Sequence, residues 1–391
     1  MTRFDQKLGR AFYEKVQRDI RARMEAKGID LLILDAADDV LYTTGFSFRP
    51  NERPVALALT QTKTLLLIPE LEREHAESQD VAAETLVYFE FPGVDRAFNV
   101  LARALGDVRG TVAHTYGTSV ARSAELTALF INSRVVATEI VSKMRQIKYP
   151  EEVALHREAA RISDEMVRSG VDLVTEAFRA GKPLPSEITL ENHVVRHALD
   201  IMENEHENIL HVPVLAGGLI NVGTKSAFPH GIATAQRVKP GDVFILSLGC
   251  RVGGRASESE RTFILGEPTR AQEDYYGIAR EAQRLATAGM LAGRTCASAD
   301  TTALTYIRKS GMTPFLKHRV GHGMGVAFHE SPWVEEGDQT IMEANMICSS
   351  EPALYVPEVG GFRLADTVLV TNSEPETLTN YPRNFAEIVL S

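Results

Sequence analysis

The spacing of the apolar runs changes near residue 140, and this change constrains the fold more than any other feature of the sequence. Before it, short apolar runs such as DLLILDA, PVALALT and TKTLLLIPE are interleaved with helical stretches expected at 68–80 and 94–106. Buried strands that alternate with helices are typical of an α/β domain. We therefore predict an α/β domain over residues 1–140.

The second part of the chain has a different pattern. A basic, proline-punctuated stretch leads into a long helix whose first turn contains Glu151 and Glu152, where carboxylates suit the helix dipole. More helices are expected at 187–204 and 270–312, while strands such as DVFILSLG and DTVLVT stand in separate blocks. Helices and strands in blocks favour an α+β domain, which we place at 141–391.

Charge and composition narrow the class of partner. A net charge of -10 argues against nucleic acid or an anionic membrane surface, because both require clustered positive charge. The three cysteines form no CxxC pair, so neither a disulfide framework nor a structural zinc site is expected. Residues 1–28 read as a charged amphipathic helix rather than a signal peptide, and no segment has about 20 apolar residues in succession. We expect a soluble, cytoplasmic protein that acts on a small molecule.

Histidines beside glycines are the first candidates for chemistry. GHGMGVAFHESP contains His322 and His329, and SAFPHG contains His230. Glycine lets a ligand or the backbone approach a neighbouring histidine closely, and histidine is the usual general acid or base near neutral pH. The alternatives are a capping role for His329 and a solvent-exposed turn for His230.

Two acidic segments are the second candidates. GRASESERTF contains Glu258 and Glu260, and SSEPALYVPEVGGFRLADT contains Glu351, Arg363 and Asp366. If the first segment is a strand, Glu258 and Glu260 lie on the same face, because side chains alternate with period two. The alternative is a solvated sheet edge with a surface ion pair.

Taken in order, PHG, GDVFILSLG, SESERTF, GHGMGVAFHESP, SSEPALYVP and GGFRLADTVLVT resemble the motif series of the creatinase, prolidase, methionine aminopeptidase and aminopeptidase P family. The similarity covers roughly residues 145–385. It implies an α/β N-terminal domain, an α+β pita-bread catalytic domain, and a homodimer.

The metallopeptidases of this family bind two divalent ions with two aspartates, a histidine and two glutamates. Glu258, His322 and Glu351 match three of these ligands, whereas Ser247 and Ala365 stand where two carboxylates are expected. The resemblance therefore implies that the paired metal centre is lost and that no cofactor is needed. A single manganese, cobalt or zinc ion on Glu258, His322 and Glu351 is the alternative.

The resemblance to the creatinase and ectoine hydrolase branch implies a metal-independent hydrolase that cleaves a C–N bond in a small carboxylate-bearing amide or amidine. His230 is then the general base and acid, and Glu260 orients the substrate or attacks it. Substrate binding falls to Arg363 and to Arg53 of a second subunit. The remaining residues expected to line the pocket are Glu258, His322, His329, Glu351 and Phe48.

Two other interpretations stay open. The first is a metal-dependent Xaa-Pro aminopeptidase or dipeptidase, and the second is a non-catalytic member of the family that binds peptides. Retention of His230, His322, His329 and Glu351 in one domain favours an enzyme, because a binding module needs no such set of titratable groups. The substrate, the role of Glu260 and the contribution of the N-terminal domain are left undetermined by the sequence.

Overall fold

The computed structural model describes residues 3–391, and the contacts among them divide the chain into two units. The N-terminal unit comprises Lys7–Arg145 and Leu210–Pro213; the C-terminal unit comprises residues 3–6, Gln146–Ile209 and Val214–Ser391. The predicted domain boundary at 140/141 stays a proposal.

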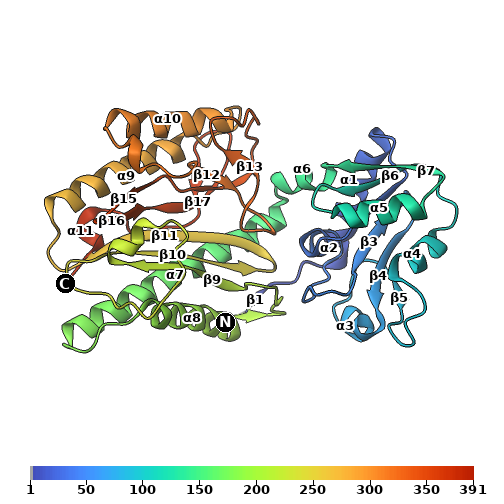
Figure 1. Cartoon of the computed structure of the whole chain (residues 1–391), viewed down its shortest axis with the longest axis horizontal. Helices are drawn as coiled ribbons and strands as arrows, with labels where there is room; N and C mark the ends of the chain where they lie inside the picture. Colours follow the sequence, from blue (N-terminus) through green and yellow to red (C-terminus); the bar gives the residue numbers. More distant parts are fainter. Residues whose placement is uncertain (1–2) are drawn as a thin grey trace. The chain divides into compact units, whose positions relative to one another are not determined.

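The N-terminal unit is built on a mixed sheet with the strand order β5-β4-β3-β2-β6-β7 (Figure 1). Its strands are β2 (Leu31–Leu34), β3 (Ala56–Leu59), β4 (Thr64–Pro69), β5 (Glu84–Tyr88), β6 (Gly110–Thr115) and β7 (Ser133–Thr138). Its helices are α1 (Arg10–Ala26), α2 (Ala37–Thr44), η1 (Glu70–Glu72), α3 (Arg73–Ser78), α4 (Ala97–Leu105), α5 (Val120–Leu129) and α6 (Ile140–Gln146), which ends at the first residue of the C-terminal unit. The expected α/β architecture is confirmed.

The first helix begins later than predicted. It starts at Arg10, after Gly9 as N-cap, whereas Phe4 and Asp5 form the short strand β1 (Phe4–Asp5). This strand pairs in parallel with β8 (His206–Glu207), far away in sequence. Amphipathic periodicity could not reveal that pairing, and the first two residues of the expected helix lie outside the described part of the chain.

The C-terminal unit contains a large sheet with the order β13-β12-β14-β17-β11-β10-β9, to which β18 and β19 add short pairings. The strands are β9 (Ala216–Val222), β10 (Val243–Val252), β11 (Arg255–Leu265), β12 (Gly321–Gly323), β13 (Glu330–Val334), β14 (Ile347–Ser350), β17 (Ala365–Leu369), β18 (Glu376–Thr377) and β19 (Val389–Leu390). A separate hairpin joins β15 (Ala353–Val356) to β16 (Gly360–Arg363).

In Figure 1, α7 and α8 lie along β9, β10 and β11, and α9 and α10 lie along the strands from β13 to β16. Their bounds are α7 (Pro150–Arg179), α8 (Glu187–Glu205), α9 (Arg270–Gly289), α10 (Cys296–Lys309) and α11 (Phe385–Ile388), with the 3-10 turns η2 (Gly223–Ala227) and η3 (Thr313–Phe315). This α+β unit agrees with the expectation. Among residues 3–391, no helix is both long and apolar enough to cross a bilayer.

Helix α7 is anchored to the central strands by charge as well as by apolar packing. Proline at its first position suits a helix start, and the carboxylate of Glu152 accepts a hydrogen bond from the backbone N–H of Tyr149. The other oxygen of Glu152 pairs with the buried Arg255 of β11 at 3.0 Å. The start of α7 is therefore tied to the start of β11.

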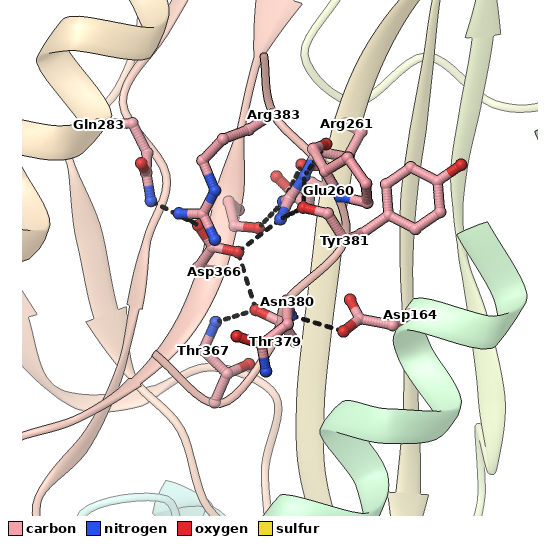
Figure 2. A network of polar contacts seen from close by, with 12 residues as sticks. Asp164, Glu260, Arg261, Gln283, Asp366, Thr367, Thr379, Asn380, Tyr381 and Arg383 are labelled. Atoms are coloured by element: carbon pink, nitrogen blue, oxygen red, sulfur yellow. Dashed lines mark hydrogen bonds and ion pairs between the residues drawn. The ribbon is translucent and has the colours of Figure 1, made fainter. Parts of the chain in front are cut away.

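A buried ion network lies behind β11 and β17. Asp366 is fully buried, and its two oxygens accept hydrogen bonds from Arg261, Thr379, Gln283 and Arg383 at 2.7–2.9 Å (Figure 2). Four donors fully satisfy this carboxylate, so the network is a stable link among β11, β17, α9 and the C-terminal segment.

Arg261 connects this network to the strand pairing itself. Its guanidinium donates to the backbone oxygens of Glu260 and Ala365, both at 2.8 Å. Glu260 and Ala365 are cross-strand partners, and side-chain alternation sends them to the opposite face from Arg261 and Asp366. The back of the sheet therefore fixes the strands that carry Glu260 on the front.

Asp300 of α10 holds the start of β12. Asp300 is only 1% exposed. One oxygen of its carboxylate accepts a hydrogen bond from the backbone N–H of Val320 at 3.2 Å. Burial is the main cause that raises the pKa of Asp300 to about 6, and the neighbouring Glu336 adds to it. This helix–strand contact lies two residues before His322.

We predict that Asp366→Asn lowers the free energy of unfolding by about 3–5 kcal/mol, because the buried Arg261 loses its counter-ion. Arg383→Met is the matched control: Arg383 is the partner of Asp366 that is 32% exposed, and its loss should cost about 1 kcal/mol or less. Denaturant unfolding of both variants measures the difference. Equal costs for the two substitutions would contradict a central role for Asp366.

A second prediction concerns pH. The pKa of Asp300 is about 6 in the folded chain and 3.8 in the unfolded reference. The folded chain therefore binds this proton more tightly, so its contribution to stability is complete below about pH 4 and is lost as the pH rises through 6. Asp300→Asn keeps an acceptor for Val320 and cannot ionise. The variant should gain about 1–2 kcal/mol relative to wild type between pH 4 and pH 7, measured by thermal unfolding. Asp274→Asn, at an exposed position, should show no such change; a flat difference for Asp300→Asn would refute the account.

Candidate active site

A cavity of about 440 Å³ lies in the C-terminal unit, over the front face of the central strands. Its volume is in the range typical of small-molecule sites. All five residues predicted to be catalytic line it, together with two of those predicted to bind substrate: His230, Glu260, His322, His329, Glu351, Glu258 and Arg363.

Separate elements bring these side chains together. Glu258 and Glu260 project from the same face of β11, as period-two alternation predicted. His322 is the central residue of β12, which pairs with β13 and β14. Glu351 follows β14 directly, and Arg363 is the last residue of β16. A solvated edge for the Glu258 segment is excluded, because both glutamates are buried.

The orientation of His322 is unusual. Its Nδ1 lies 3.1 Å from the backbone oxygen of Gly323, which can only accept, so Nδ1 carries the hydrogen. Its Nε2 lies 3.7 Å from Glu258 Oε1 and 3.4 Å from Glu351 Oε1. In the described part of the chain, neither His322 Nε2 nor Glu258 Oε1 has a hydrogen-bond partner. Three acceptor atoms thus face one another with no donor between them.

The electrostatics agree with this geometry. Burial lowers the pKa of His322 to about 3, so the imidazole is neutral at pH 7 and offers a lone pair. Burial, together with Glu260, raises the pKa of Glu351 to about 8. Burial, followed by the charges of Glu260 and Glu351, raises the pKa of Glu258 well above its usual value. The ionised forms of Glu258 and Glu351 therefore lack a counter-charge inside the chain, and a cation in the cavity would supply one.

A divalent cation fits between these donors. Two ligand atoms about 2.1 Å from one zinc ion lie about 3.4 Å apart at a tetrahedral angle, close to the separations measured around His322. Ligand atoms of Glu258, His322 and His329 also lie within 4.8 Å of one another, as do those of Glu258, Glu260 and Glu351. Neutral imidazole and carboxylates are the ligands that zinc and manganese use.

Glu260 differs from the other acidic groups because it already has cationic and hydroxyl partners. Arg363 Nε lies 2.8 Å from its Oε2, and Arg363 Nη2 lies 3.1 Å from its Oε1. The hydroxyl of Ser247, its cross-strand neighbour, also donates to Oε1. Glu260 is thus part of an internal ion pair.

The two remaining histidines lie toward the mouth of the cavity. His329 is exposed, and its ring centroid lies 4.0 Å from that of His322. Burial by the neighbouring groups lowers the pKa of His329. His230 is exposed on the loop after η2, and Arg363 donates to the backbone oxygen of the preceding Pro229 at 3.3 Å. The loop with His230 is therefore held by the same arginine that pairs with Glu260.

The lining residues that were not predicted from the sequence include His318, Arg319 and Phe328. His318 contacts the hydroxyl of Tyr355 at 2.8 Å. The guanidinium of Arg319 lies 4.1 Å over the ring of Trp333 and pairs with Glu335 at 3.1 Å. Their proximity to GHGMG was the available signal, since His318 and Arg319 lie three and two residues before that motif.

Arg53 and Phe48 belong to the N-terminal unit. Arg53 pairs there with Glu90 at 2.8 Å and with Glu52 at 2.7 Å, and Phe48 stacks on Phe46 with ring centroids 5.3 Å apart. Their predicted roles in substrate binding stay predictions.

Comparison with known families gives two matches. Residues 154–372 match metallopeptidase family M24, and residues 17–147 match the creatinase/prolidase N-terminal domain. The first match falls in the α+β C-terminal unit, and the second falls in the α/β N-terminal unit. The predicted pita-bread architecture is confirmed.

Individual relatives span the whole chain. It is 28% identical over 377 residues to an Xaa-Pro dipeptidase of Pyrococcus horikoshii, covering 95% of this chain and 98% of the relative. It is 26% identical over 366 residues to an Xaa-Pro dipeptidase of Pyrococcus furiosus, covering 92% and 96%. The solved structure of an Xaa-Pro dipeptidase from Bacillus anthracis has the same fold, with a TM-score of 0.83, 23% identity, and coverage of 97% and 100%.

These findings correct the main functional expectation. A metal-independent, creatinase-like or ectoine hydrolase-like enzyme without a cofactor is wrong, because the matching family is one of metallopeptidases and these relatives are Xaa-Pro dipeptidases. The prediction counted missing ligands and ignored the lone pair of His322, which faces Glu258 and Glu351 in an arrangement that can bind a cation. The chain belongs to metallopeptidase family M24 and carries that family's creatinase/prolidase type of N-terminal domain.

Proposed function

We propose that this protein is a divalent-metal-dependent peptidase that hydrolyses the peptide bond of small Xaa-Pro substrates, dipeptides above all. The observation that carries the proposal is the convergence of His322 Nε2, Glu258 Oε1 and Glu351 Oε1 without a donor among them. The names of the relatives supply the substrate class.

Glu258, His322 and Glu351 are the residues that would hold the ion, with His329 beside them. A divalent ion in such a site supplies a Lewis acid and lowers the pKa of bound water. The protein fixes the ligands in advance: Gly323 orients His322 through its carbonyl, and Thr367 donates its hydroxyl hydrogen bond to the backbone oxygen of Glu258 at 2.9 Å. The first contact lies within β12, and the second comes from β17, which is next to β11 in the sheet.

His230 is our proposed proton carrier toward the leaving nitrogen of the substrate. It lines the cavity on a loop rather than on a strand, and it is exposed enough to exchange protons with water. Histidine is suited to this role because it titrates near neutral pH. Its loop is anchored by the contact between Arg363 and Pro229, which keeps the imidazole over the cavity.

The cavity wall can distinguish the two ends of a dipeptide. Leu219, Leu248 and Phe328 provide apolar surface for a proline ring. Arg319 and His329 provide positive or titratable groups for the terminal carboxylate. Because most donors of Arg363 are engaged by Glu260, Tyr355 and Pro229, Arg319 is the better partner for that carboxylate than the arginine predicted from the sequence.

A homodimer is part of the proposal, with Arg53 and Phe48 as the N-terminal residues that would approach a substrate bound by the partner subunit. The exposed apolar side chains Phe89, Phe91 and Val94 lie in the same unit, and Glu90, which pairs with Arg53, stands between two of them. Exposed apolar groups of this size favour contact with another protein surface.

We predict that the purified protein hydrolyses Xaa-Pro dipeptides, that a chelator abolishes the activity, and that manganese, cobalt or zinc restores it. A non-proline dipeptide and a longer Xaa-Pro peptide serve as substrate controls. Release of free proline is the measurement. Hydrolysis that continues in metal-free, chelated protein would contradict metal dependence, and metal binding without any hydrolysis would favour the peptide-binding interpretation.

We further predict that His230→Ala lowers kcat for the dipeptide by about 10²- to 10⁴-fold, the usual contribution of a general acid or base. The melting temperature should not change, because His230 is exposed. His193→Ala, on the exposed surface of α8, is the matched control and should keep full activity. If His230→Ala retains more than a tenth of the wild-type kcat, His230 is not the proton carrier.

A further inference from the structure

The cavity offers two overlapping positions for a cation. Glu258, His322 and His329 surround one of them, and Glu258, Glu260 and Glu351 surround the other. Glu258 is common to both, so two divalent ions would have to share it. Whether both positions are available depends on what already binds the remaining groups.

Glu260 is the group that distinguishes the second position. Both of its oxygens face donors of Arg363, at 2.8 and 3.1 Å, and one also accepts from the hydroxyl of Ser247. The guanidinium donates one charge-assisted hydrogen bond, from Nη2 to Oε1, and its Nε is in ion-pair contact with Oε2, so both oxygens of Glu260 face the positive charge. A metal ion would have to displace that pair to bind Glu260.

Arg363 has little freedom to leave. It is 4% exposed, and its Nη1 contacts the hydroxyl of Tyr355 and the backbone oxygen of Pro229, both at 3.3 Å. Burial is the largest influence and disfavours its charge, but Glu260, Tyr355 and Glu351 together outweigh burial and raise the pKa of Arg363. The guanidinium is therefore a permanent positive charge inside the cavity wall.

The strands on either side of β11 place no carboxylate directly opposite Glu260. Its two cross-strand partners are Ser247 on β10 and Ala365 on β17, and neither has a negative charge. Four glutamates line the cavity, and because Glu335 is paired with Arg319 at 3.1 Å, the carboxylates left to balance are Glu258, Glu260 and Glu351. The guanidinium of Arg363 cancels one of their charges, and a single divalent ion cancels the other two. A second divalent ion would leave a buried positive excess, which is costly in a low-dielectric site.

We propose that Arg363 takes the place of a second cation, so that each chain binds one divalent ion, at the position around His322. The inference deepens the proposed function, because it concerns the same site. It assigns Glu260 and Arg363 to a fixed internal ion pair. Glu351, whose Oε1 lies 3.4 Å from His322 Nε2, then joins Glu258 and His322 around the ion, with His329 beside them.

The test is the metal stoichiometry of the full-length protein, with manganese as the probe. Calorimetric titration of metal-free protein should give one manganese per chain, and electron paramagnetic resonance should show an isolated ion without a coupled neighbour. Arg363→Met removes the charge at similar length and frees Glu260, so this variant should take up a second ion. Arg363→Lys keeps the charge and should still bind one.

Arg383→Met is the matched control, because Arg383 pairs with Asp366 on the back of the sheet and does not line the cavity; it should bind one ion. Two ions in the wild type, or none, would overturn the inference, as would one ion in a folded Arg363→Met variant. The wild-type result decides the question even if Arg363→Met does not fold. One bound ion without dipeptide hydrolysis would refute the proposed function and leave this inference standing.

Discussion

The structure depends on the repulsion among buried carboxylates that its central strands force together. Glu258 and Glu260 share a face of β11, and Glu351 at the end of β14 points into the same cavity. Their charges are not dispersed by solvent, so each needs a specific partner. Arg363 partners Glu260 from within the chain. Glu258 and Glu351 face the lone pair of His322 instead, and this set of acceptors without a donor is the basis for the proposed cation site.

The polar side chains on the two faces of β11 differ in whether they have hydrogen-bond partners. On the back, Arg261 and Asp366 form a network in which every oxygen of the carboxylate has donors, and it is closed by Gln283, Thr379 and Arg383 (Figure 2). On the front, acceptors remain unmatched. Arg261 joins the two by donating to the backbone of Glu260 and Ala365. The polar network on the back, in which every group has a partner, thus holds in place the strands whose front side chains lack partners. A rigid support of this kind keeps the groups of the site close together despite their repulsion.

Much of this arrangement could be predicted from the sequence. Alternation along SESER placed Glu258 and Glu260 on one face, and the order of the motifs grouped six or more distant side chains into one cavity. What could not be predicted depends on contacts between distant segments. The pairing of β1 with β8 has no local signal, and neither has the pairing of Arg363 with Glu260. The metal-free interpretation failed for the same reason, because Ser247 and Ala365 can be counted in a sequence whereas the direction of the His322 lone pair cannot.

The most direct test of the account is a crystal structure of the protein grown with manganese, with diffraction recorded near the manganese absorption edge. The account predicts a single anomalous peak per chain, within about 2.5 Å of ligand atoms of Glu258, His322 and Glu351, while Arg363 stays paired with Glu260. Two peaks bridged by Glu258, or a cavity without any peak at saturating manganese, would contradict it.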